Sequence, residues 1–183
     1  MTLRTAFKVA ESLVSALVSS ITGSGQQGNS AELKVGDAAP PFDLPGSDGR
    51  AHRLADYKGK SAVVLAWFPK AFTGGGTAEC KSLRESGAAI RHFNVAYFAI
   101  SADDAKTNKE FAEQVEADYP ILADASKEIA RAYGVLSGMG FPNRWTFYIG
   151  PDGRILYIDK SVKASTAGQD VAAKLSELGV AKN

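Results

Sequence analysis

The sequence predicts an α/β fold with a central mixed sheet flanked by helices. Along residues 33–183, short β-branched and aromatic runs alternate with segments of helical spacing, as expected of strands joined by crossover helices. The last two strand-like runs instead flank a tight turn, so they should pair antiparallel while the earlier strands pair in parallel. With 183 residues, the chain is long enough to bury a sizeable core in one such domain.

Two segments precede this domain. The apolar side chains of residues 1–22 form one stripe of a helical wheel, opposite Arg4 and Lys8, which predicts an N-terminal amphipathic helix. Three interpretations of this helix stay open: it docks on the body or on a second subunit, it anchors the chain at a membrane surface, or it is a cleaved signal. Residues 23–32 are small and polar and predict a flexible linker, so the domain proper spans 33–183.

The first half of the domain predicts two strands and two helices. Ser61–Phe68 and Asn94–Ser101 are short apolar runs typical of strands that are buried on both faces. Thr77–Phe93, which lies between them, has helical spacing. Ala105–Ala117 is rich in good helix formers and predicts the second helix.

The second half predicts a short strand, a helix, a hairpin and a final helix. These elements are, in order, 120–124, 126–133, 145–149 paired with 154–159, and 165–178. Pro151-Asp-Gly153 is the turn signal of the hairpin, and Gly179 ends the last helix. This order of elements fits a thioredoxin-like fold.

Charge and cysteine content exclude several classes of function. The chain has 21 basic and 20 acidic residues, which makes nucleic acid a poor candidate partner. No run of eighteen apolar residues occurs, so no conventional membrane span is predicted. The single Cys80 excludes an internal disulfide, a Cys-rich zinc site and any Cys-x-x-Cys pair.

The segment Pro69-Lys-Ala-Phe-Thr73-Gly-Gly-Gly76 follows a predicted buried strand and resembles the active-site loop of a peroxiredoxin. That family has the pattern Pro-x-x-x-Thr-x-x-Cys; Pro69 and Thr73 match it, whereas Gly76 stands in the place of the nucleophilic cysteine. The resemblance extends from Val35 to the C-terminal hairpin and is to the bacterioferritin-comigratory, PrxQ-like branch. Arg144 lies where that branch carries its active-site arginine, and some relatives of the branch use selenocysteine as the nucleophile.

The resemblance implies a peroxidase that reduces hydrogen or organic peroxides with electrons from a thioredoxin-like dithiol, without a metal or organic cofactor. Thr73 would hydrogen-bond the peroxide, Arg144 would supply a fixed positive charge, and Pro69 would shield the pocket. A nucleophile at position 76 would lie at the mouth of the predicted helix, where the helix dipole favours a thiolate.

Cys80 lies one helical turn beyond position 76, on the same helix face, and would be the resolving thiol. Many members of the branch resolve from five residues after the nucleophile, whereas the spacing here is four. Cys80 could equally be a small buried residue of the helix.

Three explanations of Gly76 stay open. A cysteine or selenocysteine belongs at this position and has been replaced; Cys80 alone serves as a single-cysteine peroxidase; or the chain is a catalytically silent scaffold that acts in binding. The expected state is a monomer or homodimer in the cytoplasm, or an exported or membrane-associated protein if residues 1–22 act as a signal or an anchor.

Overall fold

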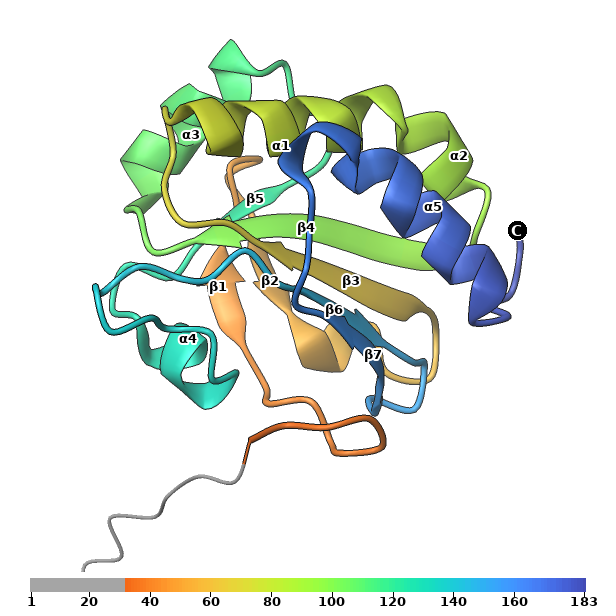
Figure 1. Cartoon of the computed structure of the whole chain (residues 1–183). Coiled ribbons are helices and arrows are strands. Elements are labelled where there is room, and N and C mark those ends of the chain that lie inside the picture. Colours follow the sequence, from red (N-terminus) through yellow and green to blue (C-terminus); the bar gives the residue numbers. More distant parts are fainter. Residues whose placement is uncertain (1–31) are drawn as a thin grey trace, which may run out of the picture. The chain divides into compact units, whose positions relative to one another are not determined.

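A five-stranded sheet forms the centre of the computed structural model, which describes residues 32–183 (Figure 1). Its strand order is β5-β4-β3-β6-β7, in which β3, β4 and β5 are parallel and the β6–β7 hairpin is antiparallel to β3. The strands are β3 (Ala62–Trp67), β4 (Val95–Ser101), β5 (Ile121–Ala123), β6 (Thr146–Ile149) and β7 (Ile155–Asp159). The predicted helix over 1–22 and residues 23–31 of the predicted linker lie outside the described residues.

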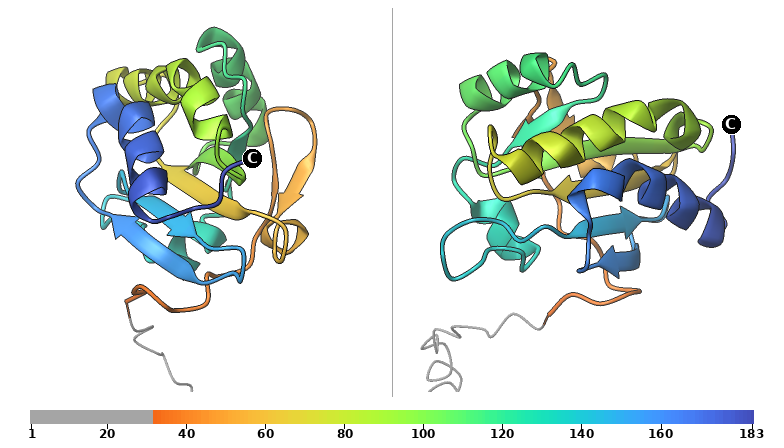
Figure 2. Two further views of the ribbon diagram at one scale, coloured as in Figure 1. Left: turned by 90° about the vertical axis from the view of Figure 1, so that its right-hand side faces the viewer. Right: turned by 45° about the horizontal axis from the view of Figure 1, so that its top comes forward.

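Helices cover both faces of the sheet. One face carries α1 (Gly74–Glu85), α2 (Gly87–Arg91), α3 (Ala105–Gln114) and α5 (Ala167–Glu177), the last preceded by the 3-10 turn η2 (Ala164–Thr166) (Figures 1 and 2). The other face carries α4 (Glu128–Ala132), the hairpin of β1 (Asp43–Pro45) and β2 (Ala51–Arg53), and the 3-10 turn η1 (Leu54–Asp56). None of the helices in residues 32–183 is long and apolar enough to span a membrane.

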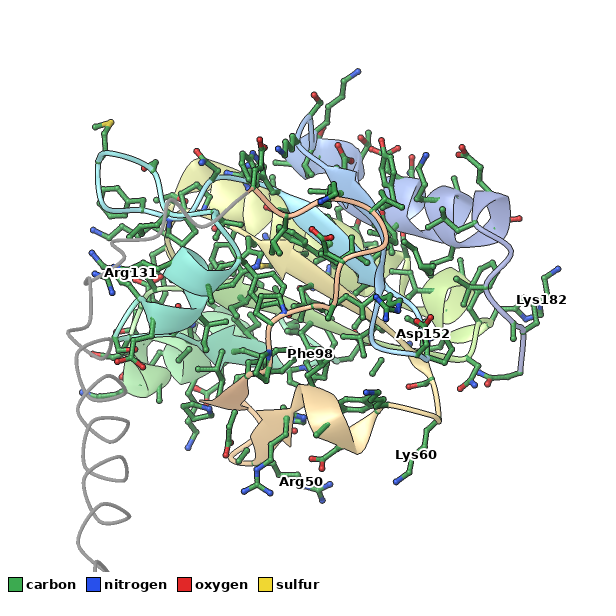
Figure 3. All side chains as sticks on the ribbon, turned by 90° about the horizontal axis from the view of Figure 1, so that it is seen from below. Arg50, Lys60, Phe98, Arg131, Asp152 and Lys182 are labelled. Carbon is green, nitrogen blue, oxygen red and sulfur yellow. The ribbon has the colours of Figure 1, made fainter. Side chains whose placement is uncertain are left out.

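The side chains of β3 alternate between two cores. Val64 and Ala66 belong to the cluster under α1, α3 and α5, whereas Val63, Leu65 and Trp67 belong to the cluster on the opposite face. Every residue of β3 is buried, as the continuous apolar run predicts for a central parallel strand. Seen from below, the buried side chain of Phe98 from β4 lies in the middle of the second face, with Arg50 and Lys60 at its edge (Figure 3).

The helices α1 and α5 approach each other closely on the first face (Figure 2). Gly168 at the start of α5 packs against the backbone of α1, so that a methyl group at this position would overlap the carbonyl of Ser82. The Gly168 N–H also donates a hydrogen bond of 2.9 Å to the Ser82 hydroxyl oxygen. Only glycine permits this approach, which fixes the middle of α1 on the body of the domain.

The mixed sheet, its helix layers and the terminal hairpin confirm the predicted thioredoxin-like fold. The prediction was wrong about the helix over Thr77–Phe93, which is divided at Ser86 into α1 and α2. The helix also starts earlier than predicted, because Thr73 caps it and draws Gly74 to Gly76 into its first turn. The short β1–β2 hairpin and η1 had no counterpart in the prediction.

Candidate active site

The loop that follows β3 leaves the sheet at the carboxyl end of a buried parallel strand. The backbone N–H of Ala71 donates to the Asp103 carboxylate at 2.9 Å, which ties the loop to the end of β4. The next residue, Phe72, has a φ of 60°, a left-handed conformation that costs a bulky side chain about 1 kcal/mol. Two features therefore shape the loop before α1 begins: a carboxylate anchor and a strained residue.

Asp103 belongs to a buried polar network at the ends of β4 and β5. The Ser101 hydroxyl donates to the Asp103 carboxylate at 2.8 Å, and the Asn108 amide donates to Ser101 Oγ at 2.9 Å and to the Leu122 carbonyl at 3.0 Å. Ser101 and Asn108 are fully buried. A satisfied network of this kind is rigid, so it holds the loop through Ala71 in a single position.

Thr73 is the N-cap of α1. Its backbone is extended, its hydroxyl oxygen accepts the N–H of Gly76 at 3.1 Å, and its hydroxyl proton goes to the Lys70 carbonyl at 2.8 Å. The oxygen keeps one lone pair, with which it can accept the O–H of a peroxide. The contact with peroxide expected of Thr73 is thus compatible with its role as a cap.

Gly76 is buried in the first turn of α1. A Cβ atom built on it would lie 2.6 Å from the Lys70 carbonyl oxygen, 3.0 Å from Thr73 Oγ1 and 3.3 Å from the Phe68 ring. The loop therefore closes around glycine, and a larger residue at this position requires the Lys70 carbonyl to move.

Arg144 reaches the same turn from the segment before β6. Its Nη1 donates to the Gly75 carbonyl at 3.3 Å and pairs with the Glu79 carboxylate. A Cβ atom on Gly75 would lie 2.5 Å from Arg144 Nη2, so the guanidinium covers the backbone next to position 76. The structure thus brings Thr73, Gly76 and Arg144 together at the start of α1.

Glu79 is a functional candidate that the sequence analysis did not identify. It is fully buried, and while one carboxylate oxygen pairs with Arg144, the other has no hydrogen-bond partner. Burial raises its pKa to about 7, against the opposing effect of the Arg144 charge. A signal was present in the sequence, because residues 76, 79, 80 and 83 share one face of a helix, and Glu is the only charged residue among them.

Cys80 is fully buried in the core under α1. Burial, together with the neighbouring Glu79 charge, raises the pKa of the thiol, which opposes thiolate formation. The Cys80 carbonyl accepts a 2.6 Å hydrogen bond from the Tyr119 hydroxyl, which fixes the helix backbone at this point. In this arrangement Cys80 can reach position 76 or a peroxide only if the first turns of α1 unwind.

Pro69 lies on the outer side of the loop. It lines a cavity of about 110 Å³ together with Lys70, Asp103, Lys127 and Phe141. A larger hollow of about 290 Å³ lies at the opposite end of the sheet, by the turn at Gly153, and none of the predicted site residues lines it. Within residues 32–183, no group of three or more His, Cys, Asp and Glu side chains could hold a metal ion.

Comparison with known proteins identifies the family of the chain. The model of the AhpC/TSA family matches residues 35–158. Peroxiredoxin Bcp of Escherichia coli K12 is 31% identical over 140 residues, which cover 73% of this chain and 89% of that relative.

Solved structures show the same fold. Peroxidoxin BcpB from Mycobacterium tuberculosis superposes with a TM-score of 0.73 at 30% identity, over 80% of this chain and 98% of that one. A C47S mutant of PrxQ from Xylella fastidiosa superposes with a TM-score of 0.75 at 23% identity, over 81% and 99% of the two chains. The chain therefore belongs to the AhpC/TSA family and, within it, to the peroxiredoxins of the bacterioferritin-comigratory, PrxQ-like branch.

Proposed function

We propose that the first turn of α1, with Thr73 and Arg144, is the peroxide site of a thiol or selenol peroxidase whose nucleophile belongs at position 76. The observation that carries this proposal is the Arg144 guanidinium, which a separate segment of the chain holds over Gly75. A fixed cation and a helix N-terminus at one point both stabilise an anion there. Apolar side chains of similar volume would stabilise the fold at least as well as the Glu79–Arg144 pair, so stability alone does not account for this pair.

The reaction follows from these groups. A thiolate at position 76 would attack the outer oxygen of a peroxide ROOH, so that an S–O bond forms while the O–O bond breaks. The leaving RO⁻ takes a proton from solvent to become ROH, and the thiol sulfur is oxidised to a sulfenic acid. Arg144 and the N–H groups of the first turn stabilise the negative charge that moves onto the leaving oxygen.

Cys80 would complete the cycle as the resolving thiol. Its sulfur would displace water from the sulfenic acid, forming a disulfide that an external dithiol of the thioredoxin type reduces. Because Cys80 is buried and its backbone is held by Tyr119, this step needs local unwinding of α1. Thioredoxin-like dithiols are kept reduced in the cytoplasm, so the cytoplasm is the proposed compartment.

A specific observation favours a second candidate, the silent scaffold. The Lys70 carbonyl oxygen lies 2.6 Å from where the Cβ of a nucleophilic residue would be, which is too close for a real contact, so the loop is closed around Gly76. The third candidate, in which Cys80 alone attacks peroxide, is opposed by its complete burial and its raised pKa.

A pair of variants separates these candidates. Gly76→Cys should consume hydrogen peroxide in an assay coupled to thioredoxin, thioredoxin reductase and NADPH, at a rate at least a hundredfold above that of the parent chain. Gly76→Ser is the matched control, because it makes the same steric demand on the loop without a thiol. Comparable inactivity of Gly76→Cys and Gly76→Ser, with both folded by circular dichroism, would support the scaffold instead.

The resolving role is tested in the same background. Gly76→Cys with Cys80→Ser should form a sulfenic acid that a dimedone trap labels at position 76, but no intramolecular disulfide. In the parent chain, substoichiometric peroxide should leave Cys80 unmodified by mass spectrometry. A sulfenic acid at Cys80 of the parent would establish the single-cysteine mechanism.

A further inference from the structure

The described residues leave four large apolar side chains exposed, and three of them lie either in the loop before α1 or in the segment between α4 and β6, which meet at one cavity. These are Phe72, Met139 and Phe141, exposed by 50%, 85% and 42%, while the fourth, Val35, is 60% exposed. Val35 lies beside the start of β7, at the other end of the sheet. Single exposed apolar residues are ordinary, but a group of them at one end of a domain marks an interaction surface.

Met139 is presented by a rigid turn. The segment between α4 and β6 extends beyond the sheet (Figure 1), and at its tip the Gly140 N–H donates to the Ser137 carbonyl at 3.0 Å. The Ser137 N–H in turn donates to the Phe141 carbonyl at 2.8 Å, which closes a small hairpin. The tip is therefore a fixed convex projection with an apolar end, and it buries Met139 against no other part of the described domain.

Two lysines flank this projection. Lys70 Nζ lies 5.8 Å from the centre of the Phe141 ring, and Lys127 Nζ approaches Gly140, 3.4 Å from where a Cβ would be. The nearby Asp103 carboxylate already accepts two hydrogen bonds within the domain. Exposed apolar side chains beside ammonium groups fit a lipid bilayer, because the apolar groups can enter its hydrocarbon region while the ammonium groups face anionic headgroups.

We propose that the active-site end of the domain docks on an anionic lipid bilayer, with Met139 and Phe141 entering the interface and Lys70 and Lys127 facing the headgroups. The docking does not depend on the proposed peroxidase function.

Docking is tested by cosedimentation of the full parent chain with vesicles of phosphatidylcholine and phosphatidylglycerol. The chain should bind these vesicles, and binding should weaken in phosphatidylcholine alone and at high salt. Met139→Glu should lower the vesicle affinity about tenfold, and Lys70→Ala with Lys127→Ala by a similar factor. Val35→Glu is the control, because it places the same charge on another exposed apolar residue at the far end, and it should bind as the parent does.

Each other outcome overturns the docking proposal. Equal binding of Met139→Glu and the parent would assign attachment to residues 1–22 alone. Self-association of the parent without lipid, abolished by Met139→Glu in sedimentation velocity, would assign the surface to a second copy of the chain. Weaker binding of Val35→Glu to the same degree would show that the effect is general loss of apolar surface.

Discussion

In two turns at the end of the sheet away from the site, the residues with left-handed backbone conformations are glycines. Gly59 and Gly153 both have a φ of 80°, and the Gly59 N–H donates to the Pro151 carbonyl at 2.7 Å. In the two loops that precede α1 and α4, residues with side chains adopt this conformation, Phe72 with a φ of 60° and Lys127 with a φ of 63°. The same backbone requirement is met by the favourable residue in the first pair of turns and by costly residues in the second pair.

The charged groups differ in the same way. Asp152 in the far turn is exposed and accepts only the Arg154 N–H, whereas Asp103 and Glu79 at the site end are partly or fully buried. Strained backbone and buried charge persist where function, rather than stability, selects the residues. The comparison therefore supports the proposal that this end of the domain is the functional one.

Alanine substitution of Asp103 at the site end and of Asp152 in the far turn should give the largest difference in the free energy of unfolding. Asp103→Ala leaves the Ala71 N–H and the Ser101 hydroxyl without an acceptor, and we expect it to lower the free energy of unfolding by about 4 kcal/mol. Asp152→Ala removes one exposed hydrogen bond and should cost less than about 1 kcal/mol. Urea denaturation measures both values, and similar losses would remove the distinction between the two ends.

The next largest effect is expected at Glu79, as a dependence of the free energy of unfolding on pH. Its pKa is raised from 4.5 to about 7 in the folded protein, so the stability contributed by its proton is complete below pH 4.5 and is lost as the pH rises through 7. Glu79→Gln does not titrate, so its stability relative to the parent should improve between pH 4.5 and 8, by on the order of 3 kcal/mol.

The control for this effect is Glu85→Gln. Glu85 lies on the same helix with an exposed side chain, so the stability difference between this variant and the parent should stay nearly flat over the same pH range. Thermal unfolding followed at several pH values gives both curves. A flat curve for Glu79→Gln as well would mean that the Glu79 carboxyl keeps its ordinary pKa in the fold.

The smallest predicted effect concerns backbone conformation. Lys127→Gly relieves a left-handed residue and should raise the free energy of unfolding by up to about 1 kcal/mol, whereas Gly153→Ala introduces the same strain and should lower it by about 1 kcal/mol. Chemical denaturation measures both changes in the free energy of unfolding, and opposite signs for the two variants would support the difference between the two ends. Destabilisation by both variants would instead attribute the Lys127 conformation to favourable side-chain contacts.

Much of the architecture could be predicted because strands such as Ala62–Trp67 are buried on both faces and carry an unbroken apolar run. The β1–β2 hairpin could not, since each strand has only three residues and its pairing depends on tertiary contacts. The early start of α1 was missed for a related reason. Three consecutive glycines disfavour a helix, and the Thr73 cap that overcomes this is visible only in the structure.

The prediction of the site depended on a family pattern, and in the structure Thr73, Gly76 and Arg144 lie close together at the start of α1. The place of Glu79 in the candidate site was harder to predict from the sequence, because no neighbouring residue in the chain marks it as one half of an ion pair. Arg144, its partner, is 65 residues away along the chain. Long-range pairs of this kind become visible only when the fold brings two segments together.

The fixed contacts along α1 set how far the helix can open. The Tyr119 hydroxyl holds the Cys80 carbonyl, and two residues further on Gly168 holds Ser82. Hydrogen exchange should therefore be fast for the amides of the first turn, from Gly74 to Thr77, and slow beyond Ser82. Attack on a peroxide at position 76 thus needs no opening beyond the first turn, whereas a disulfide with Cys80 requires the next turn to leave the Tyr119 hydroxyl while Gly168 keeps Ser82 in place.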